Sequence, residues 1–175
     1  VVENYGSEKK ELIIDIYSTL SRFYIDNFEF KKAIEIINKG LELEKNNIKI
    51  LSSKGALLNY QDNFTESQEI FEFVLEKEIE KYGQDSFELW PTKQYIASNY
   101  SSLGMYLKSN EILKSIIKDA YNDGWEDVVY LDIGDNYRFL GDYQKAKYFY
   151  KEALKIQQKF YGDSHRHTST TFYNL

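Results

Sequence analysis

The run YLDIGDNYRFLGDYQKAKYFYKEA, residues 130–153, contains two amphipathic segments separated by a short turn. In the first segment Gly134 is followed three residues later by Tyr137, and the second segment repeats this small-to-large alternation. Residues three or four apart share one face of a helix, so each segment has a helical period. Gly141 and Asp142 between them are residues that end one helix and cap the next. The run therefore predicts a helical hairpin.

This hairpin pattern occurs four times along the chain, at intervals of 34, 42 and 37 residues. Six columns of residues follow the same intervals, which makes an internal repeat the primary signal of the sequence. The columns are Ser21, Gly55, Ala97 and Gly134; Tyr24, Leu58, Tyr100 and Tyr137; Phe30, Phe64, Tyr106 and Tyr143; Ala33, Ser67, Ser109 and Ala146; Ile37, Phe71, Leu113 and Tyr150; and Gly40, Val74, Ile116 and Ala153. We interpret the third column as the aromatic residue that opens the second helix of each hairpin.

The alternation of small and large residues resembles the tetratricopeptide repeat family. Its signature places are occupied in the last full copy by Tyr130, Ile133, Gly134, Tyr137, Ala146, Tyr150 and Ala153. Second helices that continue to Tyr82-Gly83 and Tyr161-Gly162, with His165 in the second of the loops that follow, are similar to the 42-residue kinesin light chain subtype. The resemblance implies an all-α fold, a right-handed α-α superhelix of antiparallel helical hairpins.

The copies predict one repeat array over residues 1–175. Full repeats are expected at approximately 14–47, 48–81, 90–123 and 127–160, and residues 165–175 resemble the opening of a partial fifth repeat. Residues 1–13 are interpreted as the tail of a preceding repeat or as an entry helix. Because an array usually ends in a capping helix with a polar outer face, we interpret the chain as a fragment of a larger protein.

Composition limits the classes of partner. The chain is 42% hydrophobic and 17% aromatic, enough apolar material to fold, and it has no cysteine for disulfides or thiolate metal sites. Its net charge of -6, with lysines spaced among glutamates, argues against a nucleic-acid partner. No apolar run approaches membrane-spanning length and no signal peptide begins the chain, so we expect no membrane partner and a cytoplasmic location.

Catalytic motifs are missing from the sequence. It contains no glycine-rich phosphate loop, nucleophile elbow or HExxH motif, and we expect neither catalytic residues nor a cofactor. His165 and His167 with Asp163 have the residue types of a metal site. We disfavour that interpretation because the loop matches the linker of the family that the repeats resemble.

The family resemblance implies that the first helix of each hairpin lines a concave surface. Projection of these helices predicts partner-binding residues at Arg22, Lys49, Asn59, Tyr60, Gln94, Leu131, Asp135, Arg138 and Phe139, with the short side chains of Ser98, Ser101 and Ser102 in the third repeat. Packing against the next repeat or surface ion pairing is the alternative explanation at each position. The carboxylate clamp of some family members is not reproduced, because the matching places hold Ser18, Arg22, Ser52, Ala56, Gln94 and Ser98.

Two classes of function follow. The first is a protein-protein interaction module that binds a peptide or partner domain on its concave surface, within a scaffold or signalling protein. The second is the regulatory or sensor part of a multidomain enzyme, such as a caspase-like protease, a kinase or a peptide-sensing phosphatase regulator. Self-association of the array is a third possibility.

Overall fold

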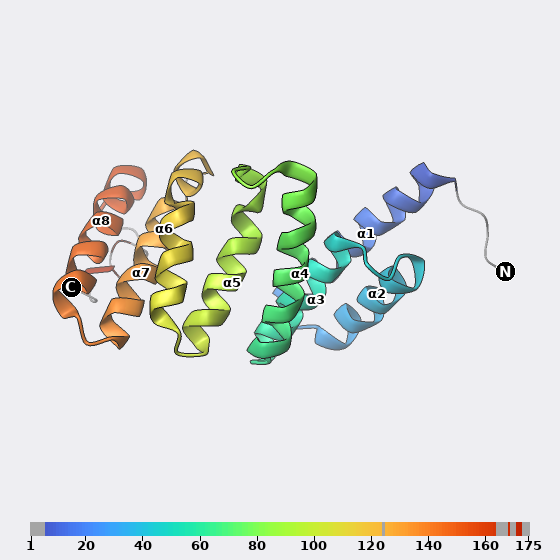
Figure 1. Ribbon diagram of the computed structural model, residues 1–175, viewed down its shortest axis with the longest axis horizontal. Helices are drawn as coiled ribbons and strands as arrows, with labels where there is room; N and C mark the ends of the chain where they lie inside the picture. Colours follow the sequence, from blue (N-terminus) through green and yellow to red (C-terminus); the bar gives the residue numbers. More distant parts are fainter. Residues whose placement is uncertain (1–5, 124, 164–167, 169–170, 173–175) are drawn as a thin grey trace. The chain divides into compact units, whose positions relative to one another are not determined.

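The computed structural model describes residues 6–123, 125–163, 168 and 171–172, and these are arranged as helical hairpins. The chain divides into two compact units, residues 1–84 and 85–175. Unit 1 contains α1 (Ser7–Asp26), α2 (Phe30–Leu43), α3 (Ile48–Tyr60) and α4 (Phe64–Tyr82). Unit 2 contains the 3-10 turn η1 (Phe87–Leu89), α5 (Trp90–Ser102), α6 (Tyr106–Asp123), α7 (Glu126–Phe139) and α8 (Tyr143–Tyr161) (Figure 1). The predicted all-α class and the antiparallel hairpins are confirmed.

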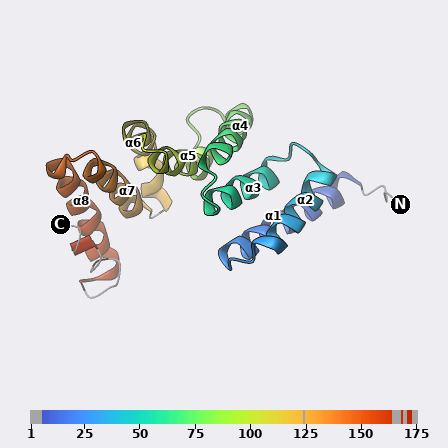
Figure 2. The ribbon, with the colours of Figure 1, turned by 90° about the horizontal axis from the view of Figure 1, so that it is seen from below.

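Residues of the repeat columns contribute to the cores of both units. The aromatic column is confirmed as the start of each second helix, since α2, α4, α6 and α8 begin at Phe30, Phe64, Tyr106 and Tyr143. Figure 2 shows α7 and α8 lying side by side as one such hairpin. Unit 1 has a core cluster of Ile14, Ile25, Ala33, Ile37, Ile50 and Leu57, and unit 2 has one of Ala97, Leu113, Ile116, Val129, Ile133, Tyr137, Ala146 and Tyr150.

Small residues on the first helix of a hairpin leave room for large side chains of the second helix. A Cβ atom placed on Gly134 would lie 2.6 Å from two ring carbons of Tyr150, and one on Gly55 would lie 2.9 Å from the ring of Phe71. The rings occupy the space that a side chain would otherwise fill, so the two helices of a hairpin cross at close range.

All four hairpin turns share one backbone conformation. A residue of positive φ follows each first helix: Phe28 and Asp62 at 59°, Gly104 at 76° and Gly141 at 78°. In hairpin 4, which is formed by α7 and α8 when the hairpins are counted in chain order, the Gly141 amide donates to the Arg138 carbonyl at 3.0 Å and the Asp142 amide to the Tyr137 carbonyl at 2.9 Å. This pair of bonds, a Schellman motif, satisfies carbonyls that the helix end leaves open. The four positive-φ residues follow the column intervals.

The ends of the helices refine three expectations. Helices α4 and α8 end where expected, but Gly83 and Gly162 combine positive φ with extended ψ of 158° and 170°, a region other than the left-handed helical one. Residues 7–13 are part of α1 itself. Within residues 165–175, Thr168 and Thr171 are buried, and the Thr171 hydroxyl donates to Gln157, which in turn donates to Asp127.

Candidate functional site

Unit 2 contains a hollow between α5, α6 and α7, which we call the α5–α7 hollow. Its volume is about 160 Å³, and its lining residues are Ser98, Ser101, Ser102, Ser109, Leu113, Asp132, Asp135 and Phe139. Ser109 and Leu113 are buried at its floor, whereas Ser98, Ser102 and Phe139 are exposed at its mouth. Most of the polar lining groups are hydroxyls or carboxylates, so the hollow is rich in hydrogen-bond acceptors.

Two carboxyl groups, one turn apart on α7, differ in their partners. Asp135 accepts a hydrogen bond from the Tyr150 hydroxyl at 2.7 Å, and the Arg138 Nε lies 3.4 Å from the same oxygen. Asp132 is half-buried and has a side-chain hydrogen bond with Gln94. Burial raises the pKa of Asp132 to about 7, with a further rise from the Asp135 charge, and the Gln94 hydrogen bond opposes both.

Asn136 fixes the positions of two serines that line the hollow, Ser101 and Ser109. Its Oδ1 accepts from the Ser101 hydroxyl at 2.6 Å, and its Nδ2 donates to the Ser109 Oγ and to the Asn110 Oδ1, each at 2.9 Å. Asn136, Ser109 and Asn110 are all buried. Because Asn136 bonds to both α5 and α6, this network holds the three helices in register around the hollow.

The mouth of the hollow has an aromatic and cationic edge. The ring of Phe139 stacks on Tyr106 with centroids 5.2 Å apart and an interplanar angle of 10°. The guanidinium of Arg138 lies 4.5 Å from the Phe139 centroid. Phe139 is nevertheless 56% exposed. An exposed aromatic side chain beside an arginine is a composition that protein interfaces favour.

Four of the five predicted residues of unit 2 lie in or beside this hollow. Asp135 and Phe139 line it, Gln94 bonds to its Asp132, and Arg138 contacts Asp135 at its edge. Leu131 is half-buried and packs against the core cluster of unit 2. The structure thus gives Leu131 a packing role.

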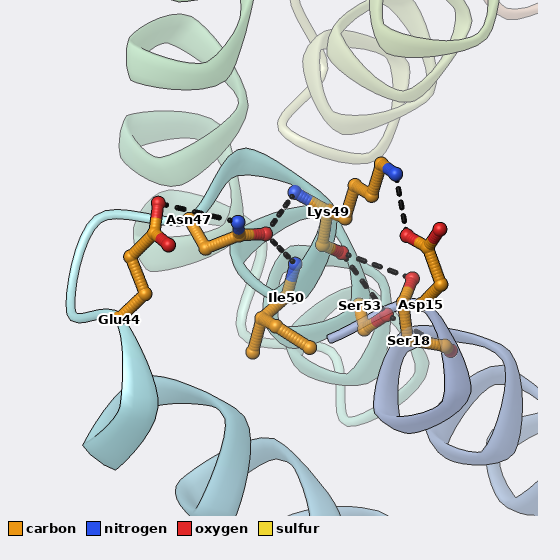
Figure 3. Close-up of polar contacts among 7 residues, drawn as sticks. All are labelled: Asp15, Ser18, Glu44, Asn47, Lys49, Ile50 and Ser53. Carbon is orange, nitrogen blue, oxygen red and sulfur yellow. Dashed lines mark hydrogen bonds and ion pairs between the residues drawn. The ribbon is translucent and has the colours of Figure 1, made fainter. Parts of the chain in front are cut away.

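The predicted residues of unit 1 make ordinary local contacts. Lys49 on α3 forms an ion pair with Asp15 on α1, and its carbonyl accepts from the Ser18 hydroxyl at 3.4 Å (Figure 3). Tyr60 packs its ring near Phe28, with centroids 6.3 Å apart. Arg22 and Asn59 are half-buried, and Ala56, which projection placed on the outward face, is fully buried.

Sequence reasoning missed Asp132 and Asn136. The predicted partner-binding residues on this helix, α7, were Leu131, Asp135, Arg138 and Phe139, and they included neither Asp132 nor Asn136. One signal was available, because Asp132 stands three residues before Asp135 and therefore on the same face of α7. Their distant partners Gln94, Ser101 and Ser109 come from other helices, and no local pattern reveals those contacts.

Among the described residues, no three His, Cys, Asp or Glu side chains are grouped as metal ligands would be. None of the helices in the described ranges is long and apolar enough to cross a membrane. The histidines of the disfavoured metal site, His165 and His167, lie outside the described residues.

Sequence comparison identifies repeats at both ends of the chain. One tetratricopeptide repeat profile matches residues 126–175 and a second matches residues 14–47. No sequence match was found among curated proteins.

Solved structures with a similar fold include repeat proteins of several kinds. The nearly identical TPR-like repeats of a Podosopora anserina protein, described as a kinesin light chain, align with a TM-score of 0.73 at 15% identity, covering 93% of this chain and 83% of that one. BtubC (BKLC) from P. vanneervenii aligns at 0.77 and 18% identity, covering 93% and 70%. A signal transduction ATPase from Pyrococcus horikoshii with a tetratricopeptide repeat sensor aligns at 0.76 and 21% identity, covering 98% of this chain and 27% of that one.

Proposed function

Because the chain is a tetratricopeptide repeat protein, we propose that it is a protein-protein interaction module that binds a peptide or partner domain. The proposed binding surface in unit 2 is the α5–α7 hollow with its edge at Arg138 and Phe139. In unit 1 the proposed contacts are those of the first helices α1 and α3, at Arg22, Lys49, Asn59 and Tyr60.

The observation that carries this proposal is the hollow itself. Its acceptor groups come from three helices, and several have partners within the protein: Ser101 and Ser109 bond to Asn136, and Asp135 bonds to Tyr150. These groups are therefore ordered before any partner arrives. A preformed surface loses less conformational entropy on binding than a flexible one. The exposed ring of Phe139 adds apolar area that a partner would cover.

Replacement of Arg138 and Phe139 by alanine tests the proposal. The double variant Arg138→Ala/Phe139→Ala is compared with wild type in affinity capture from an extract of the source cells, followed by size-exclusion chromatography of each recovered complex. We expect loss of the specific complexes in this variant. The matched control is Tyr148→Ala/Lys151→Ala, which removes an exposed aromatic and an exposed cation from the outer helix α8. Equal recovery from both variants, with the fold intact by circular dichroism, would contradict the proposal.

A second function is favoured by one comparison. The Pyrococcus horikoshii ATPase carries a tetratricopeptide repeat sensor, and the present chain aligns with 27% of its length. Under this alternative the chain is the regulatory or sensor part of a multidomain enzyme. The complete reading frame distinguishes the two: a nucleotide-binding motif or a catalytic His-Cys pair beside these repeats supports the sensor, and further repeats support the scaffold.

A further inference from the structure

We propose that the α5–α7 hollow receives the cationic end of a lysine or arginine side chain presented by the partner. This inference rests on the proposed function and adds to it the chemical class of the group that is recognised. It concerns the residues of unit 2 alone.

The two carboxyl groups that line the hollow, Asp132 and Asp135, favour a cationic ligand. Asp135 already has Tyr150 and Arg138 as partners, but in the described part of the chain no lysine or arginine forms an ion pair with Asp132. A carboxylate withdrawn from water without a cation is costly, and a cation brought by a ligand offsets that cost. An acidic ligand would instead meet two carboxyl groups of its own sign.

The neutral lining groups also suit a donor-rich ligand. Ser98, Ser101 and Ser102 present hydroxyl oxygens along α5, and Ser101 uses its proton to bond Asn136. The lone pairs of Ser101 therefore remain for a donor. Ammonium and guanidinium groups carry three and five N–H donors and no acceptor, which complements a wall of hydroxyls and carboxylates.

The size of the hollow and its apolar parts match the stem of such a side chain. Its volume of about 160 Å³ is roughly ten times the ~10–15 Å³ that holds one water in the same measure. Leu113 provides an apolar floor and Phe139 an aromatic edge. Lysine and arginine place methylene groups along such surfaces while their charged ends reach polar partners.

The test uses the full 175-residue chain, labelled with ¹⁵N and followed by NMR. The probes are N-acetyl-lysine-methylamide and N-acetyl-arginine-methylamide, and N-acetyl-norleucine-methylamide is the neutral control of similar shape. We expect saturable shifts of the Ser98, Ser101 and Ser102 amides with either or both cationic probes, and at least about tenfold weaker binding of the norleucine probe. Equal shifts for all three probes, or shifts elsewhere only, would overturn the inference.

Three variants test whether the probes bind at Asp132. Asp132→Asn keeps the shape and removes the carboxylate, so the cationic probes should bind at least about tenfold more weakly. Glu111→Gln removes one exposed carboxylate from α6 outside the hollow and should leave binding unchanged. Ser98→Lys, at an exposed place on the mouth, supplies a tethered ammonium and should block the probe even if Asp132→Asn fails to fold. Unaltered binding in Ser98→Lys would contradict the proposal.

The pH dependence of binding is a further readout. Asp135 on α7 and Gln94 on α5 act on the Asp132 carboxyl, and the hollow is completed by the serines of α5 and by Ser109 and Leu113 of α6. Arg138 and Tyr150, which contact Asp135, are the next charged or titratable groups, and the pKa of Tyr150 is raised to about 12. Tyr150 thus stays neutral and Arg138 charged between pH 6 and 8. With the pKa of Asp132 at about 7, affinity for the lysine probe should rise about tenfold from pH 6 to pH 8.

Failure of this inference and failure of the proposed function give different results. If the probes do not bind but Arg138→Ala/Phe139→Ala still loses its complexes, the surface binds a partner without a cation in the hollow. If the probes bind and the complexes persist in that variant, the hollow is a cation site that the partner does not need.

Discussion

Phe28 has a backbone conformation that is unfavourable for its residue type. It holds the positive-φ place of the first hairpin turn, where two of the other turns have glycine. A side chain with a Cβ atom is disfavoured in this conformation by roughly 1–2 kcal/mol. The ring is 71% exposed, with edge contacts to Phe30 and Tyr60 at 6.1 and 6.3 Å between centroids.

We therefore expect Phe28→Gly to be more stable than Phe28→Ala by about 1 kcal/mol. Both substitutions delete the ring, so their difference reports the backbone conformation alone. The measurement is the free energy of unfolding in urea followed by circular dichroism. An alanine variant as stable as the glycine variant would show that the turn relaxes to negative φ.

Asp132 is a second residue in an unfavourable environment, because burial disfavours its charged form. Its folded pKa of about 7 lies above the 3.8 of an unperturbed aspartate. The unfolded chain therefore releases this proton first, and between pH 4 and 7 the group makes the folded state progressively less stable as pH rises. Above pH 7 the full cost is present, because the carboxylate is then charged in both states.

Asp132→Asn should remove this cost. We expect the melting temperature of the variant, relative to wild type, to rise between pH 4 and pH 8, since asparagine carries no charge to desolvate. Thermal unfolding at a series of pH values measures it, with Glu111→Gln as the charge-matched reference. A difference that does not change with pH would show that Asp132 is solvated. A carboxylate kept at a cost in stability is typical of functional sites.

At the scale of elements, the close crossing of α7 and α8 depends on the pair Gly134 and Tyr150. In hairpin 3 the same two places hold Ala97 and Leu113, a larger residue opposite a smaller one. In each hairpin the small residue of the first helix and the large residue of the second together fill the space where the helices cross. The effect of substituting one of them therefore depends on the size of the other.

Gly134→Ala should destabilise the protein by about 1–3 kcal/mol, because the new methyl group meets the ring of Tyr150. In the background of Tyr150→Leu the same substitution should cost close to nothing or be stabilising, since alanine has the higher helix propensity. Urea denaturation of the two single variants and the double variant completes the cycle. Equal costs in both backgrounds would show that the ring does not set the helix spacing.

Much of the element scale could be predicted from the sequence. The small-large columns depend on spacing within one hairpin, and that is why the starts of α2, α4, α6 and α8 were correct. The positive-φ place in the first turn could not be predicted, because it holds Phe28 and a phenylalanine is disfavoured in that conformation. The hollow could not be predicted, because it depends on α5, α6 and α7 meeting around Asn136.

At the scale of the whole molecule, two compact units each contain a core of their own. The core cluster of unit 2 is made only of residues from 85–175, and that of unit 1 only of residues from 1–84. Because repeat proteins depend on contacts between neighbouring elements, two hairpins with a shared core can form a stable minimum.

Residues 85–175 expressed alone should therefore fold. We expect a helical circular dichroism spectrum and a cooperative unfolding transition, together with the Ser101 and Asn136 environment of the full chain by NMR. Amide shifts at these two positions that differ strongly from those of the full-length protein would show that unit 1 is needed to form the hollow. The Asn136→Ala variant of the same piece, which lacks the network, is the reference for a disrupted floor.

The four identical turns have a consequence for how such a chain changes over generations. From the small residue of a first helix to the aromatic start of the second is nine residues in every hairpin, whereas the intervals between hairpins are 34, 42 and 37. The differences in interval therefore lie outside this nine-residue step, in the helix lengths and in the joints between hairpins. Insertions at joints such as residues 83–88 leave both helices and their turn intact, but a single insertion within a turn shifts every column behind it. The turn with its flanking columns is thus the part of the repeat in which a change of length is least tolerated.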